Sequence, residues 1–281
     1  MKRIAFIIAT FIYAIGIIAQ KPIEIKASET RHGPEKGALV IIGGGEQPDE
    51  IWDKIIELAG GKNNARIVIV TNASPDTSKY VVKTIADIKA KVKTKNGVNT
   101  LTLNNIREAN DENNLQSLRE ATGVFFVGGR QWRISDVYLN TLAHEEFWNV
   151  LNRGGVIAGT SAGASIQASF LWRGDTQSHK INIGDHTQGL GFLRNSVIDQ
   201  HILARNRQFD VAAFVRIAPQ FIGLGIDEST AVVVQRDSLE VIGKSYVAVH
   251  SADKENYSFL RKGDKYDLNK HEIHLLNEKD R

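Results

Sequence analysis

The alternation of short apolar segments with longer helical ones constrains the fold of this 281-residue chain more than any other feature. Apolar runs bounded by glycines or polar turns predict strands, and helical spacing between them predicts helices. The predicted strands are residues 38–42, 66–71, 99–103, 123–127 and 155–158, and the predicted helices are residues 51–58, 80–92, 113–121 and 135–151. Strands that alternate with helices form a parallel sheet covered on both faces. We therefore predict an α/β three-layer sandwich with a mostly parallel sheet.

The last third of the chain has a different pattern. After Gly223, strand-like runs follow one another with few helical segments between them, at residues 224–226, 231–235 and 246–250. This pattern predicts an antiparallel C-terminal extension of the same sheet. Because no internal repeat and no linker-like stretch interrupts residues 38–281, we expect them to form a single domain.

The N-terminus has the three-part layout of a secretory signal peptide. Lys2 and Arg3 precede an almost wholly apolar run over residues 4–18, which ends at Ala19 and Gln20. The run is shorter than the roughly 20 residues of a comfortable membrane span. We therefore expect residues 1–20 to be a cleaved signal peptide and residues 21–37 a tether, which makes the protein periplasmic or secreted and gives it only transient contact with the membrane. An uncleaved N-terminal anchor is the alternative.

Composition excludes several classes of chemistry and partner. The chain has no cysteine, which excludes a cysteine nucleophile, thiolate metal ligands, a disulfide framework and a lipoprotein attachment site. The formal net charge is +3 and the charges are scattered, so we expect no nucleic-acid partner. No cluster of His, Asp and Glu has metal-ligand spacing, and we predict neither a metal nor an organic cofactor.

The sequence Gly159-Thr160-Ser161-Ala162-Gly163 is the strongest chemical signal. It follows a predicted strand and precedes residues 164–170, which can be helical, and G-x-S-x-G in that context is typical of a nucleophile elbow. The tight turn pushes the Ser161 hydroxyl out above the sheet, and the helix that follows supplies N–H groups near a developing oxyanion. The alternative is a serine that only caps a helix.

Two glycine-rich turns follow other predicted strands. The backbone of Gly128-Gly129-Arg130-Gln131 can approach a ligand at the carboxyl edge of the sheet, and N–H groups of Gly129 and Ala162 can together form an oxyanion hole. An ordinary strand-to-helix turn is the alternative. The turn Gly43-Gly44-Gly45-Glu46 matches neither phosphate-binding pattern, and we expect it to line the active-site edge.

A base and an acid have weaker signals. His201, in Asp199-Gln200-His201, is a candidate general base, although seven other histidines compete with it. Asp227 and Glu228 lie between two apolar runs, in Gly225-Ile226-Asp227-Glu228-Ser229-Thr230, where a carboxylate could orient that base. From the residues alone, this second segment is only a loop with two acids.

Taken together, these segments resemble the family that includes cyanophycinases and peptidase E. The likeness covers residues 38–250 and is most specific at G-T-S-A-G-A, at D-Q-H-x-x-x-R-x-R from Asp199 to Arg207, and at G-I-D-E-S-T. It implies a fold like that of class I glutamine amidotransferases, with serine in place of cysteine in the elbow. It also implies a Ser161–His201–Glu228 triad. The implied pocket residues, which would bind a peptide substrate, are Gln131, Asp199, Gln200, Arg205 and Arg207.

The implied function is a serine peptidase that hydrolyses aspartyl-containing peptides, as a cyanophycinase-like exopeptidase or dipeptidase. Whether the protein forms a homodimer stays open at this point. Two positions depart from the family pattern, which has aspartate in place of Arg130 and a third arginine in place of Asp210. Cyanophycin is an aspartate backbone with arginine on each β-carboxyl. The changed charges predict poor activity on that polymer and better activity on short aspartyl peptides, and Asp210 could neutralise Arg207.

Two other functions compete with this prediction. A catalytically silent periplasmic peptide-binding protein could use the same pocket, although binding requires no nucleophile, base or acid. An esterase of the α/β-hydrolase type would have its triad in the chain order Ser, acid, His. The order Ser161, His201, Glu228 disfavours the esterase.

Overall fold

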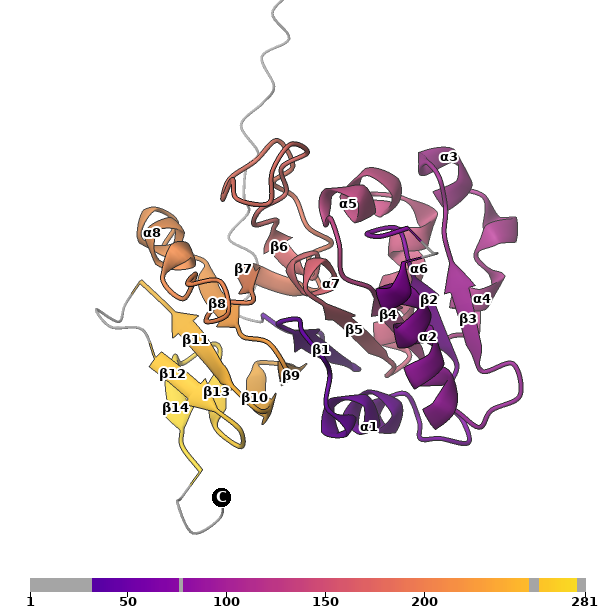
Figure 1. Cartoon of the computed structure of the whole chain (residues 1–281), viewed down its shortest axis with the longest axis horizontal. Helices are drawn as coiled ribbons and strands as arrows, with labels where there is room; N and C mark the ends of the chain where they lie inside the picture. Colours follow the sequence, from indigo (N-terminus) through magenta and orange to yellow (C-terminus); the bar gives the residue numbers. More distant parts are fainter. Residues whose placement is uncertain (1–31, 76–77, 253–257, 277–281) are drawn as a thin grey trace, which may run out of the picture.

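The structure is a computed structural model, and it describes residues 32–75, 78–252 and 258–276 (Figure 1). The predicted signal peptide, residues 1–20, lies outside the described residues, as does most of the predicted tether. None of the helices in the described ranges combines the length and the apolar character that a membrane crossing requires.

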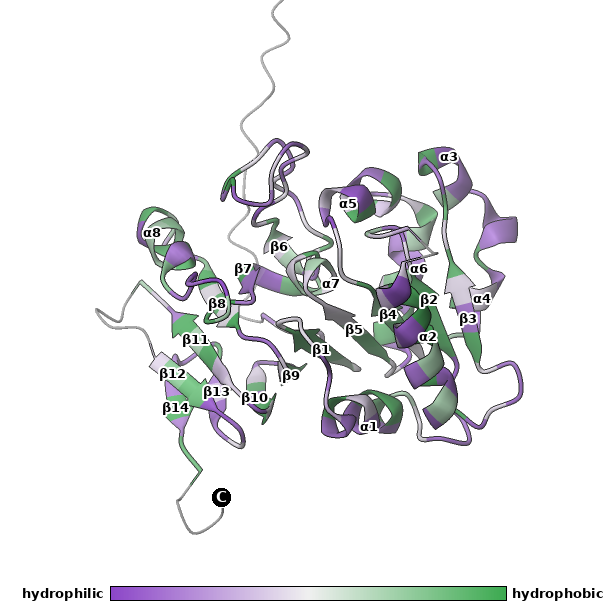
Figure 2. Cartoon of the chain, viewed as in Figure 1, coloured by the Kyte–Doolittle hydropathy of each residue, from purple (hydrophilic) through white to green (hydrophobic). Residues whose placement is uncertain are grey.

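One half of a nine-stranded sheet is parallel, as predicted. It contains β1 (Ala38–Ile42), β5 (Val156–Thr160), β4 (Gly123–Phe126), β2 (Ile67–Val70) and β3 (Val98–Leu101), in that spatial order. Every residue of the first four of these strands is buried, which explains their continuous apolar sequences. Figure 2 shows this apolar centre, with the hydrophilic residues of the helices turned outward.

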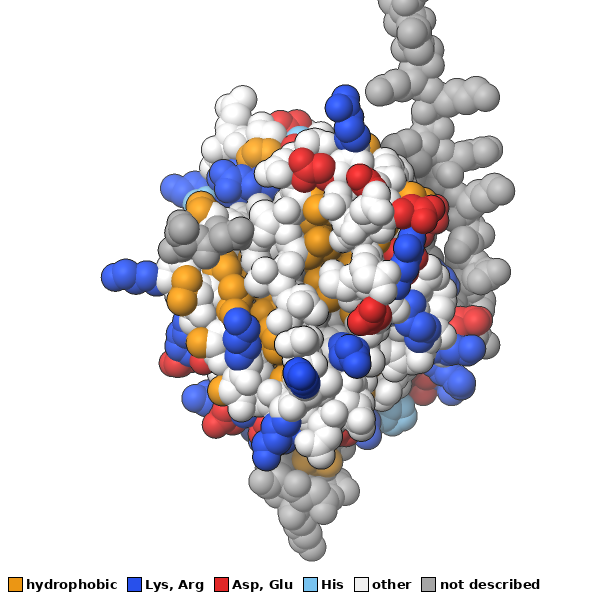
Figure 3. All heavy atoms as spheres, turned by 90° about the vertical axis from the view of Figure 1, so that its right-hand side faces the viewer, with side chains coloured by type: hydrophobic (Ala, Val, Ile, Leu, Met, Phe, Trp, Pro, Cys, Tyr) orange, Lys and Arg blue, Asp and Glu red, His pale blue; other side chains and the backbone are white. Residues whose placement is uncertain are grey.

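Helices cover both faces of this parallel half. The crossovers from β1 to β2 and from β2 to β3 run in one direction, and those from β3 to β4 and from β4 to β5 run in the other. Because such crossovers are right-handed, the two sets of helices lie on opposite faces. The first set is α1 (Asp49–Leu58) and α2 (Lys79–Lys91), and the second is α3 (Ile106–Ala109), α4 (Gln116–Arg119), α5 (Trp132–Tyr138) and α6 (Leu142–Asn152). On the face shown in Figure 3, acidic and basic side chains are interspersed.

Two predicted helices have different boundaries in the structure. The helix expected over residues 135–151 is two helices, because Asn140 takes a positive φ of 58° and Thr141 starts a new helix by accepting a hydrogen bond from the His144 N–H. The helix expected over residues 113–121 is a 3₁₀ turn, Glu112–Asn114, followed by the single-turn helix α4.

The predicted antiparallel extension is present. Strand β9 (Thr230–Gln235) pairs with β1 in antiparallel orientation, and the sheet continues through β10 (Ser238–Gly243), β13 (Lys265–Asp267) and β14 (Glu272–His274). All but the last residue of β9 are buried, because the strand lies between β1 and β10.

The predicted strands at residues 224–226 and 246–250, however, belong to a second sheet that the sequence did not reveal. Its order is β12 (Ser258–Arg261), β11 (Tyr246–His250), β8 (Ile222–Ile226), β7 (Leu193–Gln200) and β6 (Ala168–Phe170), and α8 (Asp210–Ile217) contacts it. The helix predicted for residues 164–170 ends at Ser165, because Ala168–Phe170 pairs with β7 as a strand. Because β7 and β8 are parallel neighbours in this second sheet, their carboxyl ends lie side by side.

The described end of the predicted tether is in contact with the domain. The His32 N–H donates a hydrogen bond of 2.6 Å to Asp237 Oδ1. Gly33 is buried so closely that a Cβ there would lie 1.9 Å from the Arg236 carbonyl oxygen. Residues 32–37 therefore differ from an unattached tether, whereas residues 21–31 lie outside the described residues.

Candidate active site

Ser161 lies in a strained turn between β5 and the short helix α7 (Ala162–Ser165). Its φ of 54° and ψ of −109° are unusual for a residue with a side chain. The flanking glycines allow this turn: a Cβ on Gly159 would lie 2.2 Å from the Gly163 carbonyl oxygen, and one on Gly163 would lie 2.1 Å from that of Phe126. The turn is therefore possible only because positions 159 and 163 are glycines. The turn directs the Ser161 side chain beyond the edge of the sheet.

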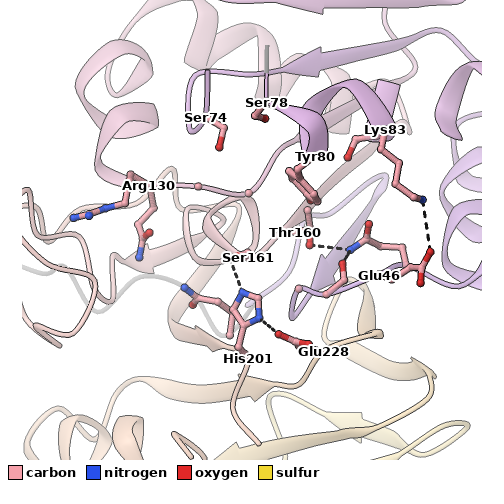
Figure 4. A pocket seen from close by; sticks show the side chains of 18 of the residues that line it. Glu46, Ser74, Ser78, Tyr80, Lys83, Arg130, Thr160, Ser161, His201 and Glu228 are labelled. Carbon is pink, nitrogen blue, oxygen red and sulfur yellow. Dashed lines mark hydrogen bonds and ion pairs between the residues drawn. The ribbon is translucent and has the colours of Figure 1, made fainter. Parts of the chain in front are cut away.

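The structure brings Ser161, His201 and Glu228 into one hydrogen-bonded line (Figure 4). His201 Nε2 lies 2.8 Å from Ser161 Oγ, and His201 Nδ1 lies 2.6 Å from Glu228 Oε1. These three residues follow the carboxyl ends of β5, β7 and β8. The His201 N–H donates to the Gly43 carbonyl at 2.9 Å, which fixes the backbone of the histidine against the first sheet. A proton on Nδ1 shared with Glu228 leaves Nε2 free to accept the Ser161 hydroxyl proton.

The surroundings of His201 keep its imidazole neutral near neutral pH. Burial lowers the pKa of His201 below its ordinary value of 6.5, and the positive charges of Arg205 and Arg207 lower it further. The hydrogen bond and the negative charge of Glu228 oppose this lowering of the pKa. A neutral imidazole is the protonation state that can act as a base.

Two adjacent carboxylates, those of Asp227 and Glu228, point to different partners. Glu228 reaches His201, whereas Asp227 is buried and stabilises the turn that follows the histidine. Asp227 Oδ1 accepts hydrogen bonds from the N–H groups of Leu203 at 3.0 Å and Ala204 at 3.2 Å, and its Oδ2 accepts one from Ser245 Oγ at 2.6 Å. Of the two acids, only Glu228 contacts the imidazole.

The two predicted oxyanion positions lie beside Ser161. A Cβ on Gly128 would be 3.3 Å from Ser161 Cβ, so the turn that contains Gly129 passes directly over the serine. Gly129 has a φ of 142°, and a Cβ there would be 2.1 Å from the Ala73 carbonyl oxygen. Ala162 is fully buried and begins α7. Both predicted positions therefore lie next to Ser161, whose Oγ would be bonded to the carbon that bears the oxyanion.

The hydrogen-bonded line opens into a cavity of about 720 Å³. Three of the five predicted pocket residues line it, Gln131, Gln200 and Arg205, and so does Gly129 of the predicted oxyanion hole. The Gln131 amide donates to the Trp172 carbonyl at 2.8 Å, and Gln200 Oε1 accepts from Ser165 Oγ at 2.6 Å. These contacts hold both amides in place at the cavity wall.

Asp199 and Arg207 were predicted to line the pocket, but neither does. Asp199 is fully buried, and both of its oxygens are occupied by Arg173, whose Nε and Nη2 lie 2.9 Å from Oδ1 and Oδ2. Trp172 Nε1 also donates to Oδ2, at 3.2 Å. Arg207 is buried too, with its Nη1 3.9 Å from Asp199 Oδ1. Asp199 is held away from the cavity by Arg173, a residue that the sequence motifs did not include.

Asp210 also differs from its expected placement. Its carboxylate accepts a short hydrogen bond from Arg173 Nη2, whereas the sequence suggested that it pairs with Arg207. Arg173, Asp199 and Asp210 therefore form an ionic cluster, and none of them lines the cavity. We call these three residues the Arg173 cluster.

The turn Gly43-Gly44-Gly45-Glu46 was expected at the active-site edge, and Gly44, Gly45 and Glu46 do line the cavity. Sequence reasoning missed the rest of this wall, which comes from Gln47, from the carboxyl end of β2 and from the start of α2: Gln47, Ser74, Ser78, Tyr80, Lys83, Thr84 and Asp87. Burial raises the pKa of the Tyr80 hydroxyl above 10, so it stays protonated and can donate a hydrogen bond. Lys83 lies 2.8 Å from Asp87 and 3.7 Å from Glu46. The rule that ligands bind at the carboxyl edge of a parallel sheet could have pointed to this wall.

The described ranges contain no group of three or more His, Asp or Glu residues arranged to hold a metal ion.

The chain is similar in sequence to known proteins. Residues 39–242 match the family described as peptidase family S51. A cyanophycinase of Geminocystis herdmanii is 28% identical over 261 residues, which cover 88% of this chain and 93% of the relative. A cyanophycinase of Trichormus variabilis is 31% identical over 224 residues, which cover 76% of this chain and 73% of the relative.

Two solved structures share the fold. A peptidase from an acI-B1 Actinobacterium superposes with a TM-score of 0.65 at 20% identity, covering 84% of this chain and 98% of the other. A putative peptidase E protein from Listeria monocytogenes superposes with a TM-score of 0.53 at 15% identity, covering 75% and 100%. The family match covers most of the chain. The protein therefore belongs to peptidase family S51 and is a serine-type peptidase.

Proposed function

We propose that this enzyme hydrolyses aspartyl-containing peptides through an acyl-enzyme on Ser161, as a cyanophycinase-like exopeptidase or dipeptidase. The observation that carries the proposal is the continuous hydrogen-bonded line from Glu228 through His201 to Ser161 at the mouth of a cavity. Each contact in the line has the length of an ordinary hydrogen bond, and the serine is held in the conformation of a nucleophile elbow.

The mechanism follows from the positions of these groups. His201 Nε2 takes the hydroxyl proton as Ser161 Oγ attacks the scissile carbonyl, and backbone N–H groups of Gly129 and Ala162 bind the oxyanion. The imidazolium then gives its proton to the leaving amine, the peptide bond breaks, and the acyl group stays on Ser161. Water, deprotonated by His201, releases the acid. Glu228 holds the imidazole in the required tautomer and stabilises its charged form.

The substrate class is supported by the charge of the cavity and by the names of the relatives. Arg205 lines the cavity and can pair with the carboxylate of an aspartyl residue, while Gln131 and Gln200 offer amides to the peptide. Two of the relatives are named cyanophycinases. Because Asp210 adds no positive charge to the cavity and Arg130 adds one, we propose short aspartyl peptides as better substrates than the cyanophycin polymer.

A fluorophosphonate probe tests the reaction class. The wild type should be labelled on Ser161, and Ser161→Ala should abolish labelling and reduce peptide turnover by about 10³-fold or more, while the fold survives. Labelling of Ser161→Ala at another residue, or unchanged turnover, would disprove the mechanism. A wild type that binds aspartyl peptides but is neither labelled nor active would instead be the silent peptide-binding protein.

We also propose that the protein is exported after cleavage of residues 1–20. The support is the sequence alone: two basic residues, an apolar run and a small residue. Mass spectrometry of the protein from its native cells should show an N-terminus at or near Gln20 or Lys21. An intact Met1 on a cytoplasmic pool would refute export.

A further inference from the structure

The cavity is uneven in charge. Three acidic residues line it, and each already has a cationic or imidazole partner: Glu46 and Asp87 face Lys83, and Glu228 faces His201. Two arginines, Arg130 and Arg205, also line it, and Arg130 lies opposite Lys83 (Figure 4). Within residues 32–75, 78–252 and 258–276, no carboxylate lies within ion-pair distance of either guanidinium.

Arg130 is positioned by two hydrogen bonds, one at each end of the residue. The preceding Gly129 passes against the Ala73 carbonyl, to which the Arg130 N–H donates at 2.9 Å. At the other end of the side chain, Nη2 donates to the Asp175 carbonyl at 2.5 Å. The Nε atom is buried and has no hydrogen-bond partner among the described residues. A guanidinium that is fixed in place, half-buried and lacking a counter-ion is a site prepared for an anion.

The position of Arg130 relative to Ser161 indicates which part of a substrate it reaches. Its side chain extends away from Ser161, opposite the wall that contains Tyr80 and Lys83 (Figure 4). His179 also lines the cavity, and its pKa is lowered by burial and by the positive charges of Arg207, Arg205 and Arg130. Arg130 therefore faces a substrate residue beyond the carbonyl that Ser161 attacks, whereas Arg205 lies four residues after His201.

We propose that Arg130 is a specificity-determining residue that binds a second substrate carboxylate, so that the enzyme prefers aspartyl peptides with a further acidic residue beside the cleaved bond. This inference rests on the proposed function and deepens it. A peptide with two carboxylates would neutralise both unpaired arginines, whereas a peptide with one would leave the Arg130 charge half-buried without a partner.

The test compares short aspartyl peptides that differ only in one flanking residue, Glu or Gln, on either side of the cleaved bond. The wild type should favour the Glu peptide at one of these two positions by about tenfold or more in kcat/KM, which corresponds to about 1.4 kcal/mol. Arg130→Gln keeps an N–H donor for the Asp175 carbonyl and removes the charge. It should abolish the preference by raising KM for the Glu peptide by about tenfold more than KM for the Gln peptide.

Two further variants show whether the effect belongs to this charge. Arg130→Lys should retain part of the preference, because it keeps the charge without the planar fork of donors. Arg133→Gln is the matched control, since Arg133 is exposed three residues later and does not line the cavity. A wild type without the preference, an Arg130→Gln variant that keeps it, or an Arg133→Gln variant that loses it equally would overturn the inference.

Binding measurements separate this inference from the proposed function. In Ser161→Ala, calorimetry with the same peptides needs no turnover, and it should give tighter binding of the Glu peptide that depends on Arg130. If the wild type hydrolyses none of the peptides but this binding preference is present, the proposed function fails and the role of Arg130 stands. If the peptides are hydrolysed but binding shows no dependence on Arg130, only the inference fails.

Discussion

Asp199 and His201 are two residues apart at the end of β7, yet they belong to charge networks of opposite character. Asp199 is completely buried, and Arg173 and Trp172 occupy both of its oxygens. The His201 ring is mostly buried as well, but it faces the cavity, and 41% of the Glu228 side chain is exposed. The first network holds a fixed charge pair, and the second holds an imidazole that can gain and lose a proton.

The difference shows that residues of one short motif can have separate roles, one in the reaction and one in supporting the fold. In the Arg173 cluster, the buried Arg173 guanidinium pairs with the buried Asp199 and the partly exposed Asp210, so the cluster positions the end of β7 and the start of α8. In the Ser161–His201–Glu228 line, partial exposure allows a substrate to approach. The roles of neighbouring motif residues therefore follow from their partners in the folded structure.

The largest expected effect concerns the two adjacent acids. Glu228→Gln removes the charge that holds the His201 tautomer, and kcat/KM should fall by about 10²- to 10⁴-fold. Asp227→Asn keeps an oxygen that can accept from Leu203 and Ala204, so its loss of kcat/KM should stay below about tenfold. Steady-state kinetics on one aspartyl peptide checks both variants, and the opposite ranking would assign the acid of the triad to Asp227.

The next largest effect concerns stability. Arg173→Met leaves the buried Asp199 carboxylate without its counter-ion, and the free energy of unfolding should fall by about 3–5 kcal/mol. Adding Asp199→Asn should recover part of that loss, because no uncompensated charge then remains at position 199. Urea denaturation measures both variants, with Arg216→Met on the exposed side of α8 as the control. Equal stability of Arg173→Met and the wild type would show that the cluster does not hold the fold.

The sequence predicted the fold best where burial leaves a continuous apolar run. Strands β1, β2, β4 and β5 are fully buried, and all were expected. The second sheet was missed because β6 has only three residues and β7 mixes polar and apolar side chains, so neither has a clear strand pattern. Local sequence also could not show which sheet β8 and β11 would join, since that depends on pairing between distant segments.

The site was predictable where local geometry demands particular residues. The glycines of the elbow reveal Ser161, and the family resemblance suggested His201 and Glu228, which the structure places in contact with it. Arg173 was missed because it comes from the irregular segment after β6 and reaches Asp199 only through the tertiary fold. Without knowledge of Arg173, a buried ion-pair residue and a pocket residue look the same in the sequence.

A smaller effect concerns the pH dependence of the Ser161–His201–Glu228 line. The pKa of His201 is lowered below 6.5, so the active neutral form is present above that pKa and is lost as the pH falls through it. Arg205→Gln removes a positive charge that lowers this pKa, and the acidic limb of the pH profile of kcat/KM should therefore move to higher pH. Arg216→Gln is the control for the loss of an arginine. An acidic limb that moves to lower pH in Arg205→Gln would contradict this electrostatic account of His201.

The smallest expected effect tests whether Asp210 belongs to the scaffold or to the specificity of the site. Asp210 shares Arg173 with Asp199, and its side chain is 34% exposed, so Asp210→Asn removes only the more solvent-accessible of the two carboxylates. Arg173 keeps its paired contacts with Asp199. The free energy of unfolding should fall by about 1 kcal/mol. The ratio of kcat/KM for a short aspartyl peptide to that for cyanophycin should not change, because Asp210 does not line the cavity. A changed ratio at unchanged stability would return Asp210 to the specificity role that the sequence suggested. It would also mean that the Arg173 cluster influences the Ser161–His201–Glu228 line rather than only supporting the fold around it.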